Sequence, residues 1–325
     1  MTIMPEGLPF IKPIDVPIDQ FPHDAYVPEG CIVHDDLSDV FQYQIDLKHV
    51  IYASPMDQYM TPNQLEMYIY IPTNPPVPWC PTNDGVKFPT VVFCQGSAFH
   101  KQWIFDHLAH HIRLAQRGYV VASIRYRASE EAPFPAQCED YKTAVRFLRK
   151  NADQFHVDPD RIGAWGDSSG GHTVLMAGFT GDDELSEGAY SDVSSEVKCI
   201  VDWYGPTDFA LMNSYPSSQY HLGADTPEGF EIGRREILEN LELVKAASPM
   251  TYLHKDKKVP PTLIMHGGND WLVPFNQSVR LYEKMRETGQ DVTFIKLEHA
   301  SHGCMGFHCE GAIDIVDDFL RKHLV

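Results

Sequence analysis

Short hydrophobic runs alternate with helix-like segments over most of this chain. The runs are apolar almost without interruption and occupy residues 89–94, 119–124, 161–165, 197–203, 261–266 and 292–297. Such a run is typical of a strand that is covered on both faces, and strands that alternate with helices form mostly parallel sheets. Because crossover connections are right-handed, the pattern predicts an α/β fold with a doubly wound sheet and helices on both faces.

The segments between these runs have the spacing of helices. We expect helices at residues 103–117, 136–154, 172–179, 275–288 and 308–323. Gly118 provides a C-terminal stop signal for the first of them. Two further strands are predicted at residues 50–53 and 65–72, which are rich in β-branched and aromatic residues.

Two regions interrupt the alternation. Residues 1–45 are rich in proline and acidic residues and lack periodicity, so we expect an N-terminal arm ahead of a domain at residues 46–325. Residues 204–258 contain no strand pattern, and connections of that length are usually functional. Their aromatic residues and an expected helix at residues 228–245 predict a small cap at about residues 205–247.

One predicted strand-to-helix turn carries a recognisable motif. Residues 166–170 read Gly-Asp-Ser-Ser-Gly, which is a G-x-S-x-G pentapeptide. In this context the serine lies on a sharp turn with its hydroxyl exposed, and the glycines let the strand and the helix approach closely. A serine hydroxyl is a weak nucleophile unless a base takes its proton, so Ser168 requires partners elsewhere in the chain. Taken alone, the pentapeptide also fits a glycine-rich turn without any chemistry.

The ends of the last two predicted strands supply candidate partners for this serine. Asp270 follows one strand and His302 follows the next, and the order Ser, Asp, His is the triad order of α/β-hydrolases. We expect His302 to act as the base and Asp270 to fix its tautomer. His299 is the alternative base, although Gly303 favours His302 because a tight turn can aim the ring. His266 is expected to be structural and to hold the loop that carries Asp270.

Six stretches of the chain have sequences typical of one superfamily. They read YRASEEAPFPA at residues 126–136, DPDRIG at 158–163, GDSSGG at 166–171, DWYGPTD at 202–208, SP at 248–249 and HGGND at 266–270. On these motifs the chain resembles the α/β-hydrolases, specifically the BD-FAE-like esterases that are similar to acetyl, acetyl xylan and feruloyl esterases. The resemblance runs from about residue 50 to the end. It implies an α/β-hydrolase fold with Ser168, Asp270 and His302 as nucleophile, acid and base.

The expected oxyanion loop departs from the pattern of this family. The relatives usually carry His-Gly-Gly-Gly or His-Gly-Gly-x, whereas residues 95–98 here read Gln-Gly-Ser-Ala. Carried over by position, the amides of Ser97 and Ala98 are the candidate donors, and the Ser97 hydroxyl is a third one. The Ser169 amide, at the start of the helix that follows the nucleophile, is expected to complete the oxyanion hole.

Other side chains are candidates for substrate contacts or for metal ligands. Aromatic and apolar residues near the predicted strand ends suit an acyl or a sugar group, and the candidates are Phe99, Trp203, Trp271 and Met305. Core packing is the alternative for each of them. His107 and His111 lie four residues apart, a spacing that metals use, but no further ligand pattern accompanies them. We therefore expect neither a metal nor another cofactor.

Charge and cysteine content limit the classes of partner and the cellular location that we expect. Acidic residues outnumber basic residues by 45 to 26, which gives a formal charge of −19 at pH 7. Nucleic acid and anionic membranes would be repelled, so we expect neither as a partner. We expect a small-molecule ester as the substrate. The oligomeric state stays open, with a homodimer as one alternative. The absence of a signal-peptide pattern, of a membrane-spanning run and of C-x-x-C predicts a cytoplasmic protein with reduced cysteines.

These observations predict a serine carboxylic-ester hydrolase that forms an acyl-enzyme. The family likeness favours acetyl esters of sugars, such as xylo-oligosaccharides, with feruloyl esters as the alternative. An amide hydrolase of the formamidase or peptidase type and a non-enzymatic binding protein on the same fold also stay open. The sequence does not identify the preferred acyl and alcohol groups.

Overall fold

The computed structural model describes residues 15–16, 20, 22, 25–33, 42–74, 85–303 and 306–325. Within these residues, eight strands form one sheet in the order β1-β2-β4-β3-β5-β6-β7-β8. The strands are β1 Gln44–Ala53, β2 Leu65–Thr73, β3 Phe88–Cys94, β4 Val120–Ile124, β5 Val157–Asp167, β6 Ile200–Trp203, β7 Thr262–Gly267 and β8 Val292–Leu297. The apolar runs therefore predicted β3 to β8, and the two further strands expected at residues 50–53 and 65–72 lie within β1 and β2.

The direction of the strands determines where loops gather. β2 is antiparallel to both of its neighbours, β1 and β4, whereas all pairs from β4 to β8 are parallel. The carboxyl ends of these parallel strands therefore lie along one edge of the sheet, where ligands bind in folds of this kind. The connections after β3, β5, β7 and β8 all emerge at that edge, and they carry the residues of the candidate site.

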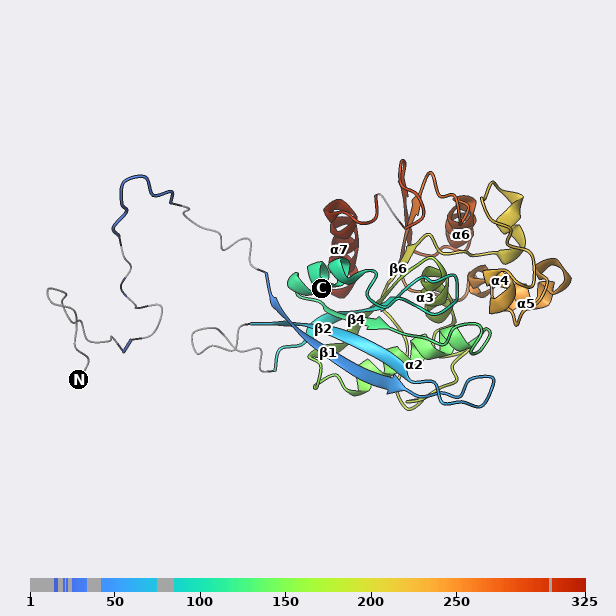
Figure 1. Ribbon diagram of the computed structural model, residues 1–325, viewed down its shortest axis with the longest axis horizontal. Helices are drawn as coiled ribbons and strands as arrows, with labels where there is room; N and C mark the ends of the chain where they lie inside the picture. The colour runs from blue at the N-terminus through green and yellow to red at the C-terminus, as the bar shows by residue number, and fades with distance from the viewer. Residues whose placement is uncertain are drawn as a thin grey trace.

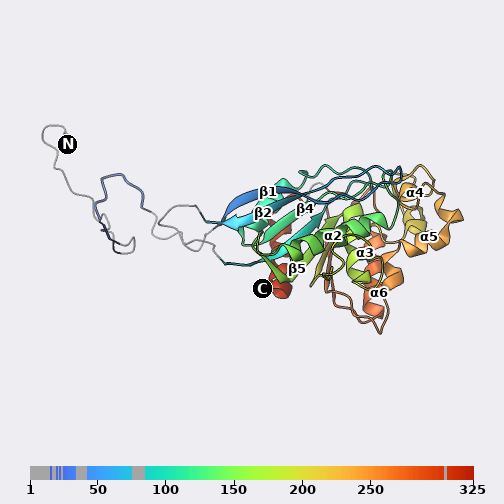
Figure 2. The same ribbon diagram turned by 90° about the horizontal axis from the view of Figure 1, so that it is seen from below.

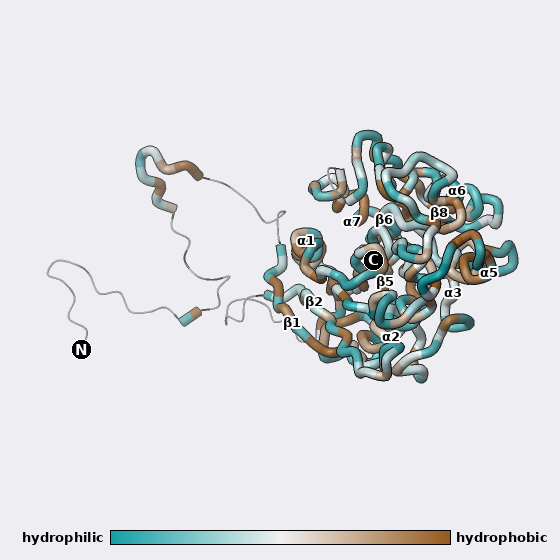
Figure 3. The backbone as a smooth tube through the Cα atoms, turned by 45° about the vertical axis from the view of Figure 1, so that its right-hand side comes forward, coloured by the Kyte–Doolittle hydropathy of each residue, from teal (hydrophilic) through white to brown (hydrophobic). Residues whose placement is uncertain are grey.

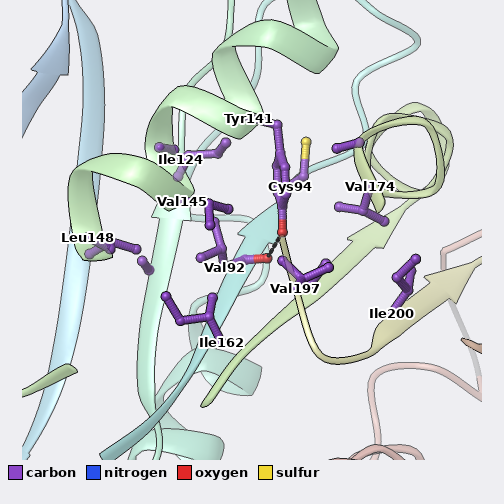
Figure 4. Packing of buried hydrophobic residues seen from close by; sticks show 14 of the residues in the cluster. Val92, Cys94, Ile124, Tyr141, Val145, Leu148, Ile162, Val174, Val197 and Ile200 are labelled. Atoms are coloured by element: carbon purple, nitrogen blue, oxygen red, sulfur yellow. Dashed lines mark hydrogen bonds between the residues drawn. The ribbon is translucent and has the colours of Figure 1, made fainter. Parts of the chain in front are cut away.

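Helices cover both faces of the sheet (Figures 1 and 2). One face carries α1 Leu108–Gln116 and α7 Glu310–Leu324, and the other carries α2 Ala136–Lys150, α3 Ser169–Thr180 and α6 Asn276–Glu287. Each layer buries its own hydrophobic cluster against the sheet. In the cluster below α2 and α3, the buried Tyr141 hydroxyl donates a hydrogen bond of 2.9 Å to the Val92 carbonyl (Figure 4). This bond satisfies a polar group that burial would otherwise leave without a partner.

The N-terminal boundary differs slightly from the expected one. β1 begins at Gln44, so the last two residues of the expected arm belong to the sheet. Most of the arm itself, including residues 1–14 and 34–41, lies outside the described residues. In the described part of the chain, no helix combines the length and the hydropathy that crossing a bilayer requires.

The cap is built from short pieces instead of the single helix expected at residues 228–245. It contains α4 Pro227–Glu231 and α5 Leu241–Ala246, with three short 3-10 helices around them, η3 Phe209–Ser214, η4 Ile237–Glu239 and η5 Pro249–Tyr252. Gly233 breaks the expected helix because its φ of 86° is left-handed, and Arg234 follows with a φ of 60°. Both views place α4 and α5 together at one end of the molecule (Figures 1 and 2).

The cap has a small hydrophobic cluster of its own. Its buried members are Phe99, Phe209, Ile232, Ile237, Val244 and Ala247. Phe99 belongs to the loop after β3, so the cap packs directly on that loop. Much of α5 is hydrophobic (Figure 3), but Leu241 and Leu243 stay exposed while Val244 is buried.

Candidate active site

The turn between β5 and α3 places Ser168 in a strained conformation. Its φ of 50° and ψ of −125° lie outside the regions that non-glycine residues usually adopt. The Ser168 amide donates a hydrogen bond of 2.8 Å to the Trp203 carbonyl at the end of β6. A Cβ atom on Gly166 would lie 2.3 Å from the Gly170 carbonyl oxygen, and one on Gly170 would lie 2.0 Å from the Cys94 carbonyl oxygen. Both glycines are therefore required for the close approach that the pentapeptide predicts.

His302, in the loop after β8, lies between the serine and a carboxylate. Its Nε2 is 3.0 Å from Ser168 Oγ, and its Nδ1 is 2.8 Å from Asp270 Oδ2. Because an ionised carboxylate only accepts hydrogen bonds, Nδ1 carries the proton and Nε2 is free to accept the proton of Ser168. His299, the alternative base, is exposed on the same loop. The structure thus brings together the three residues expected to form a triad.

Asp270 is a buried carboxylate surrounded by donors. Oδ1 accepts hydrogen bonds of 2.9 Å from each of the amides of Leu272 and Val273. Oδ2 faces His302 at 2.8 Å and His266 Nε2 at 3.1 Å. Burial alone would raise the pKa of Asp270, but the hydrogen bonds from His266 and His302 lower it to about 2. The carboxylate is therefore ionised wherever a neutral His302 is available as a base.

His266 is fully buried and links the loop after β7 to α6. Its Nδ1 is 2.7 Å from Ser278 Oγ, and its Nε2 is 3.1 Å from the Val273 carbonyl oxygen. Since Nε2 faces only acceptors, it carries the proton, and Nδ1 accepts from the Ser278 hydroxyl. The side chain holds the loop of Asp270 in place, as the sequence predicts.

Tyr204 is a residue near the site that the sequence analysis did not assign. Its ring is fully buried and lies 4.7 Å from the ring of His302, between centroids. On another side it meets Phe307 at 4.5 Å. The tyrosine therefore supports the imidazole through packing. The sequence placed it in the motif at residues 202–208 and near a predicted strand end, which gives no hint of this contact.

We call residues 95–100 the oxyanion loop, and here the structure corrects an expectation. The Ser97 amide donates a hydrogen bond of 2.9 Å to Ser169 Oγ, and the Ser97 hydroxyl donates one of 2.6 Å to the His100 carbonyl. Both donors of Ser97 are therefore engaged within the protein, and neither faces a substrate. The amides of Ala98 and Ser169 have no acceptor among the described residues. These two amides are the candidate donors that remain.

Buried neighbours hold the oxyanion loop in its unusual shape. Ala98 and Phe99 have φ values of 54° and 61°, which cost free energy in residues with a side chain. The Gly96 amide donates a hydrogen bond of 2.8 Å to Asp167 Oδ1. The Tyr126 hydroxyl donates one of 2.9 Å to the Gln95 carbonyl. The strain is thus offset by a hydrogen bond that the loop donates to the nucleophile turn and by one that it accepts from the segment after β4.

Two of the four expected substrate contacts are buried instead. Trp203 is 0% exposed and Phe99 is 1% exposed, so neither side chain reaches a substrate in this structure. Trp203 sits in the core against Trp165, and Phe99 packs in the cluster under the cap. Trp271 is half-exposed next to Asp270, and its carbonyl accepts a hydrogen bond of 2.8 Å from the Ser218 amide of the cap. Met305 lies outside the described residues.

Comparison with known proteins places this site in a family. The family model BD-FAE matches residues 79–285. The chain belongs to the BD-FAE family. Esterase LipC of Mycobacterium tuberculosis (strain ATCC 25618 / H37Rv) is 32% identical over 222 residues, which are 66% of this chain and 53% of LipC. Esterase LipQ of the same organism is 29% identical over 191 residues, which are 58% of this chain and 44% of LipQ. The chain thus spans about half the length of these curated relatives.

Solved structures agree with the family assignment and with the α/β-hydrolase fold. A truncated form of a carbohydrate esterase from gut microbiota is 31% identical to this BD-FAE chain, with a TM-score of 0.73. That alignment covers 87% of this chain and 97% of the other. A bifunctional GH43-CE protein of Bacteroides eggerthii is 29% identical with a TM-score of 0.71, and the match covers 85% of this chain and 38% of the other.

A cluster of histidines lies behind the candidate active site of this BD-FAE chain. His107, His110 and His111 are buried beside Phe93, Trp165 and Trp203. Burial lowers the pKa of His110 to about 3 and that of His111 well below the ordinary value, so both rings are neutral near pH 7. Among the described residues, no group of three or more His, Cys, Asp or Glu side chains is arranged to hold a metal ion. These histidines serve as packing residues.

Proposed function

We propose that this protein is a serine carboxylic-ester hydrolase that works through an acyl-enzyme. The observation that carries the proposal is the relay in which His302 lies 3.0 Å from Ser168 Oγ and 2.8 Å from Asp270 Oδ2. Nucleophile, base and orienting acid within hydrogen-bond distance are the geometric signature of an activated serine. The family and the esterase names of the relatives support the same chemistry.

The first half of the reaction forms the acyl-enzyme. Ser168 Oγ attacks the ester carbonyl carbon while its proton passes to His302 Nε2. The carbonyl oxygen becomes an oxyanion, which the amides of Ala98 and Ser169 stabilise. The tetrahedral intermediate then breaks its bond to the alcohol oxygen, and His302 returns the proton to this leaving group. Asp270 stabilises the imidazolium that exists between the two proton transfers.

The second half releases the acid. His302, again neutral, takes a proton from water as the water oxygen attacks the acyl carbon. The same two amides stabilise the second oxyanion. When the bond to Ser168 Oγ breaks, His302 donates its proton to the serine, and the carboxylic acid leaves. Every group involved returns to its starting state, so the enzyme needs no other reactant than water.

Acetyl esters of sugars are the substrate class that we propose. A carbohydrate esterase is among the solved structures that resemble the chain over most of both lengths, at 31% identity. The half-exposed Trp271 beside Asp270 offers an aromatic face of the kind that packs against sugar rings. A formal charge of −19 also suits an uncharged substrate better than an anionic one.

The test measures hydrolysis by the wild type, Ser168→Ala and a control, Ser191→Ala, which changes an exposed serine. The panel contains acetylated xylo-oligosaccharides, methyl ferulate, p-nitrophenyl acetate and a formyl amide. We expect Ser168→Ala to lose activity by at least roughly a thousandfold on acetyl esters, and Ser191→Ala to retain it. A preference for methyl ferulate would show that feruloyl esters, and not acetyl esters, are the substrate class. A preference for the formyl amide would show that the protein is an amide hydrolase. Full activity of Ser168→Ala would refute the serine mechanism.

A further inference from the structure

Glu231, at the end of α4 in the cap, is a carboxyl group without a counter-charge. Its side chain is 0% exposed, and none of the ion pairs formed by the described residues includes it. Among the residues that the structure describes, Oε1 has no hydrogen-bond partner, and Oε2 contacts a single donor, the Ser129 hydroxyl, at 2.6 Å. Removing a carboxylate from water costs free energy unless donors or cations replace the water, so this environment favours the neutral acid.

Counting the protons around Ser129 leads to the same conclusion. The Ser129 hydroxyl has one proton but two acceptors within reach, Glu231 Oε2 at 2.6 Å and the Phe99 carbonyl oxygen at 3.1 Å. Both contacts are hydrogen bonds only if Glu231 carries a proton. Glu231 then donates to Ser129 Oγ, and Ser129 donates to Phe99. The Ser129 amide donates a second bond of 2.9 Å to the same carbonyl.

This chain of hydrogen bonds ends on the oxyanion loop. The carbonyl of Phe99 belongs to the segment in which Ala98 and Phe99 have left-handed φ values of 54° and 61°. A strained segment keeps its conformation only when its surroundings fix it. The Phe99 carbonyl and the Ala98 N–H lie two peptide units apart and are joined through the backbone of Ala98 and Phe99. Fixing the carbonyl therefore restrains these two left-handed residues and, through them, the direction of the Ala98 N–H.

We infer that Glu231 keeps its proton at neutral pH and, through Ser129, positions the Ala98 amide for the oxyanion. The inference rests on the proposed esterase function. It makes Glu231 a positioning residue, because it touches neither the substrate nor the reacting atoms. It also gives the cap a role in the reaction, since the proton that sets the loop resides on a cap helix.

Loss of this proton has a defined consequence. Burial raises the pKa of Glu231 to about 8, although the hydrogen bond from Ser129 opposes the rise. Above that pH the Ser129 hydroxyl turns its only proton towards the carboxylate, and the Phe99 carbonyl loses one of its two donors. The loop loosens, and the oxyanion is stabilised less well.

Two titratable side chains that interact electrostatically with Glu231 do not titrate in the same range. The Tyr126 phenol, from the segment after β4, and the Cys138 thiol, from α2, both interact electrostatically with it. Burial raises the pKa of Tyr126 above its ordinary value and that of Cys138 to about 11. The backbone amide of Phe134 binds the Glu231 carbonyl and has no charge. A titration near pH 8 at this place that disappears in Glu231→Gln therefore reports Glu231.

The first test compares the pH profiles of kcat for the wild type, Glu231→Gln, Glu231→Ala and the control Glu236→Gln, which changes an exposed glutamate of the cap. Glutamine donates to Ser129 at every pH and mimics the protonated acid. Between about pH 6 and pH 10, we expect kcat to decline on the alkaline side in the wild type and in Glu236→Gln, but not in Glu231→Gln. Glu231→Ala should lower kcat roughly tenfold at neutral pH with little change of KM. An alkaline decline that persists unchanged in Glu231→Gln would overturn the inference.

A second measurement does not depend on activity. In protein labelled with 15N-alanine, the Ala98 amide signal should shift with pH in the wild type, with a midpoint about where Glu231 titrates, and stay constant in Glu231→Gln. A wild-type signal that does not move with pH overturns the positioning role, even if the protein hydrolyses esters. Conversely, a titrating Ala98 signal in a protein without hydrolase activity would refute the proposed function and leave the structural link intact.

Discussion

Two buried carboxyl groups flank the candidate site, and their environments shift their pKa values in opposite directions. Asp270 accepts hydrogen bonds from two backbone amides and from His302, with His266 beside it, and its pKa falls to about 2. Glu231 has one donor, the Ser129 hydroxyl, and its pKa rises to about 8. Both side chains are shielded from water, so burial alone does not decide the charge. Between these two groups, the difference lies in the donors that each carboxyl group meets.

A third carboxyl group near the site resembles Glu231. Asp202, at 0% exposure behind the nucleophile turn, accepts one hydrogen bond of 3.0 Å from the Gly205 amide. Burial raises its pKa to about 7, and the nearby Asp167 adds to the rise. With one donor it behaves like Glu231 and unlike Asp270. The site thus combines an ionised acid that orients the base with two buried acids, Glu231 and Asp202, whose pKa values are raised.

The largest effect is expected from removing the charge of Asp270. In Asp270→Asn the amide donates to His302 Nδ1 and forces the proton onto Nε2, which then no longer accepts from Ser168. We expect kcat for p-nitrophenyl acetate to fall about 10⁴-fold with little change of KM. The control Asp225→Asn changes an exposed aspartate of the cap and should keep wild-type activity. A decrease of less than tenfold in Asp270→Asn would show that Asp270 does not orient the base.

The next largest effect is expected in the pH dependence of stability, and it tests the contrast between Asp270 and Glu231 at Glu231. A buried acid whose pKa is raised from 4.5 to about 8 binds a proton more tightly when folded, so stability falls as the pH rises through that interval. Glu231→Gln removes the effect. Its free energy of unfolding should exceed that of the wild type by an amount that grows between about pH 4.5 and pH 8 and reaches a few kcal/mol, measured by urea denaturation. A difference independent of pH would mean that Glu231 titrates normally.

The sequence predicted the framework of both regions but not their details. Continuous apolar runs at residues 89–94 and 261–266 correspond to β3 and β7, and the positions of Ser168, Asp270 and His302 at strand ends bring them to one edge. The order and direction of the strands determine at which edge of the sheet a residue lies. They do not determine the direction in which a backbone amide points.

The misplaced expectations have local causes that a sequence pattern does not contain. The Ser97 amide donates to Ser169 Oγ, a contact that depends on the local backbone conformation. Trp203 ends a strand at the right edge, yet its side chain points into the core. The cap helix breaks at Gly233, a residue that a helical spacing pattern tolerates. Glu231 carried no signal, because its neutrality depends on a tertiary contact with Ser129.

The smallest effect is expected at acidic pH, where the Asp270 carboxylate becomes protonated. Since the pKa of Asp270 is lowered from 3.8 to about 2, its contribution to stability is complete above about pH 4 and is lost as the pH falls through 2. Between about pH 5 and pH 2, the wild type should lose about 2 kcal/mol of unfolding free energy more than Asp270→Asn. Parallel curves for the two proteins would contradict the lowered pKa and remove the contrast with Glu231.

The central claim is that Ser168 is a nucleophile made reactive by His302. A fluorophosphonate probe tests it directly, because the probe forms a covalent bond to an activated serine. Mass spectrometry of the intact wild type should show one adduct, and peptide mapping should place it on Ser168. Ser168→Ala should remain unlabelled, and His302→Ala should react far more slowly. A wild type that stays unlabelled, or one that is labelled on another serine, would contradict the account.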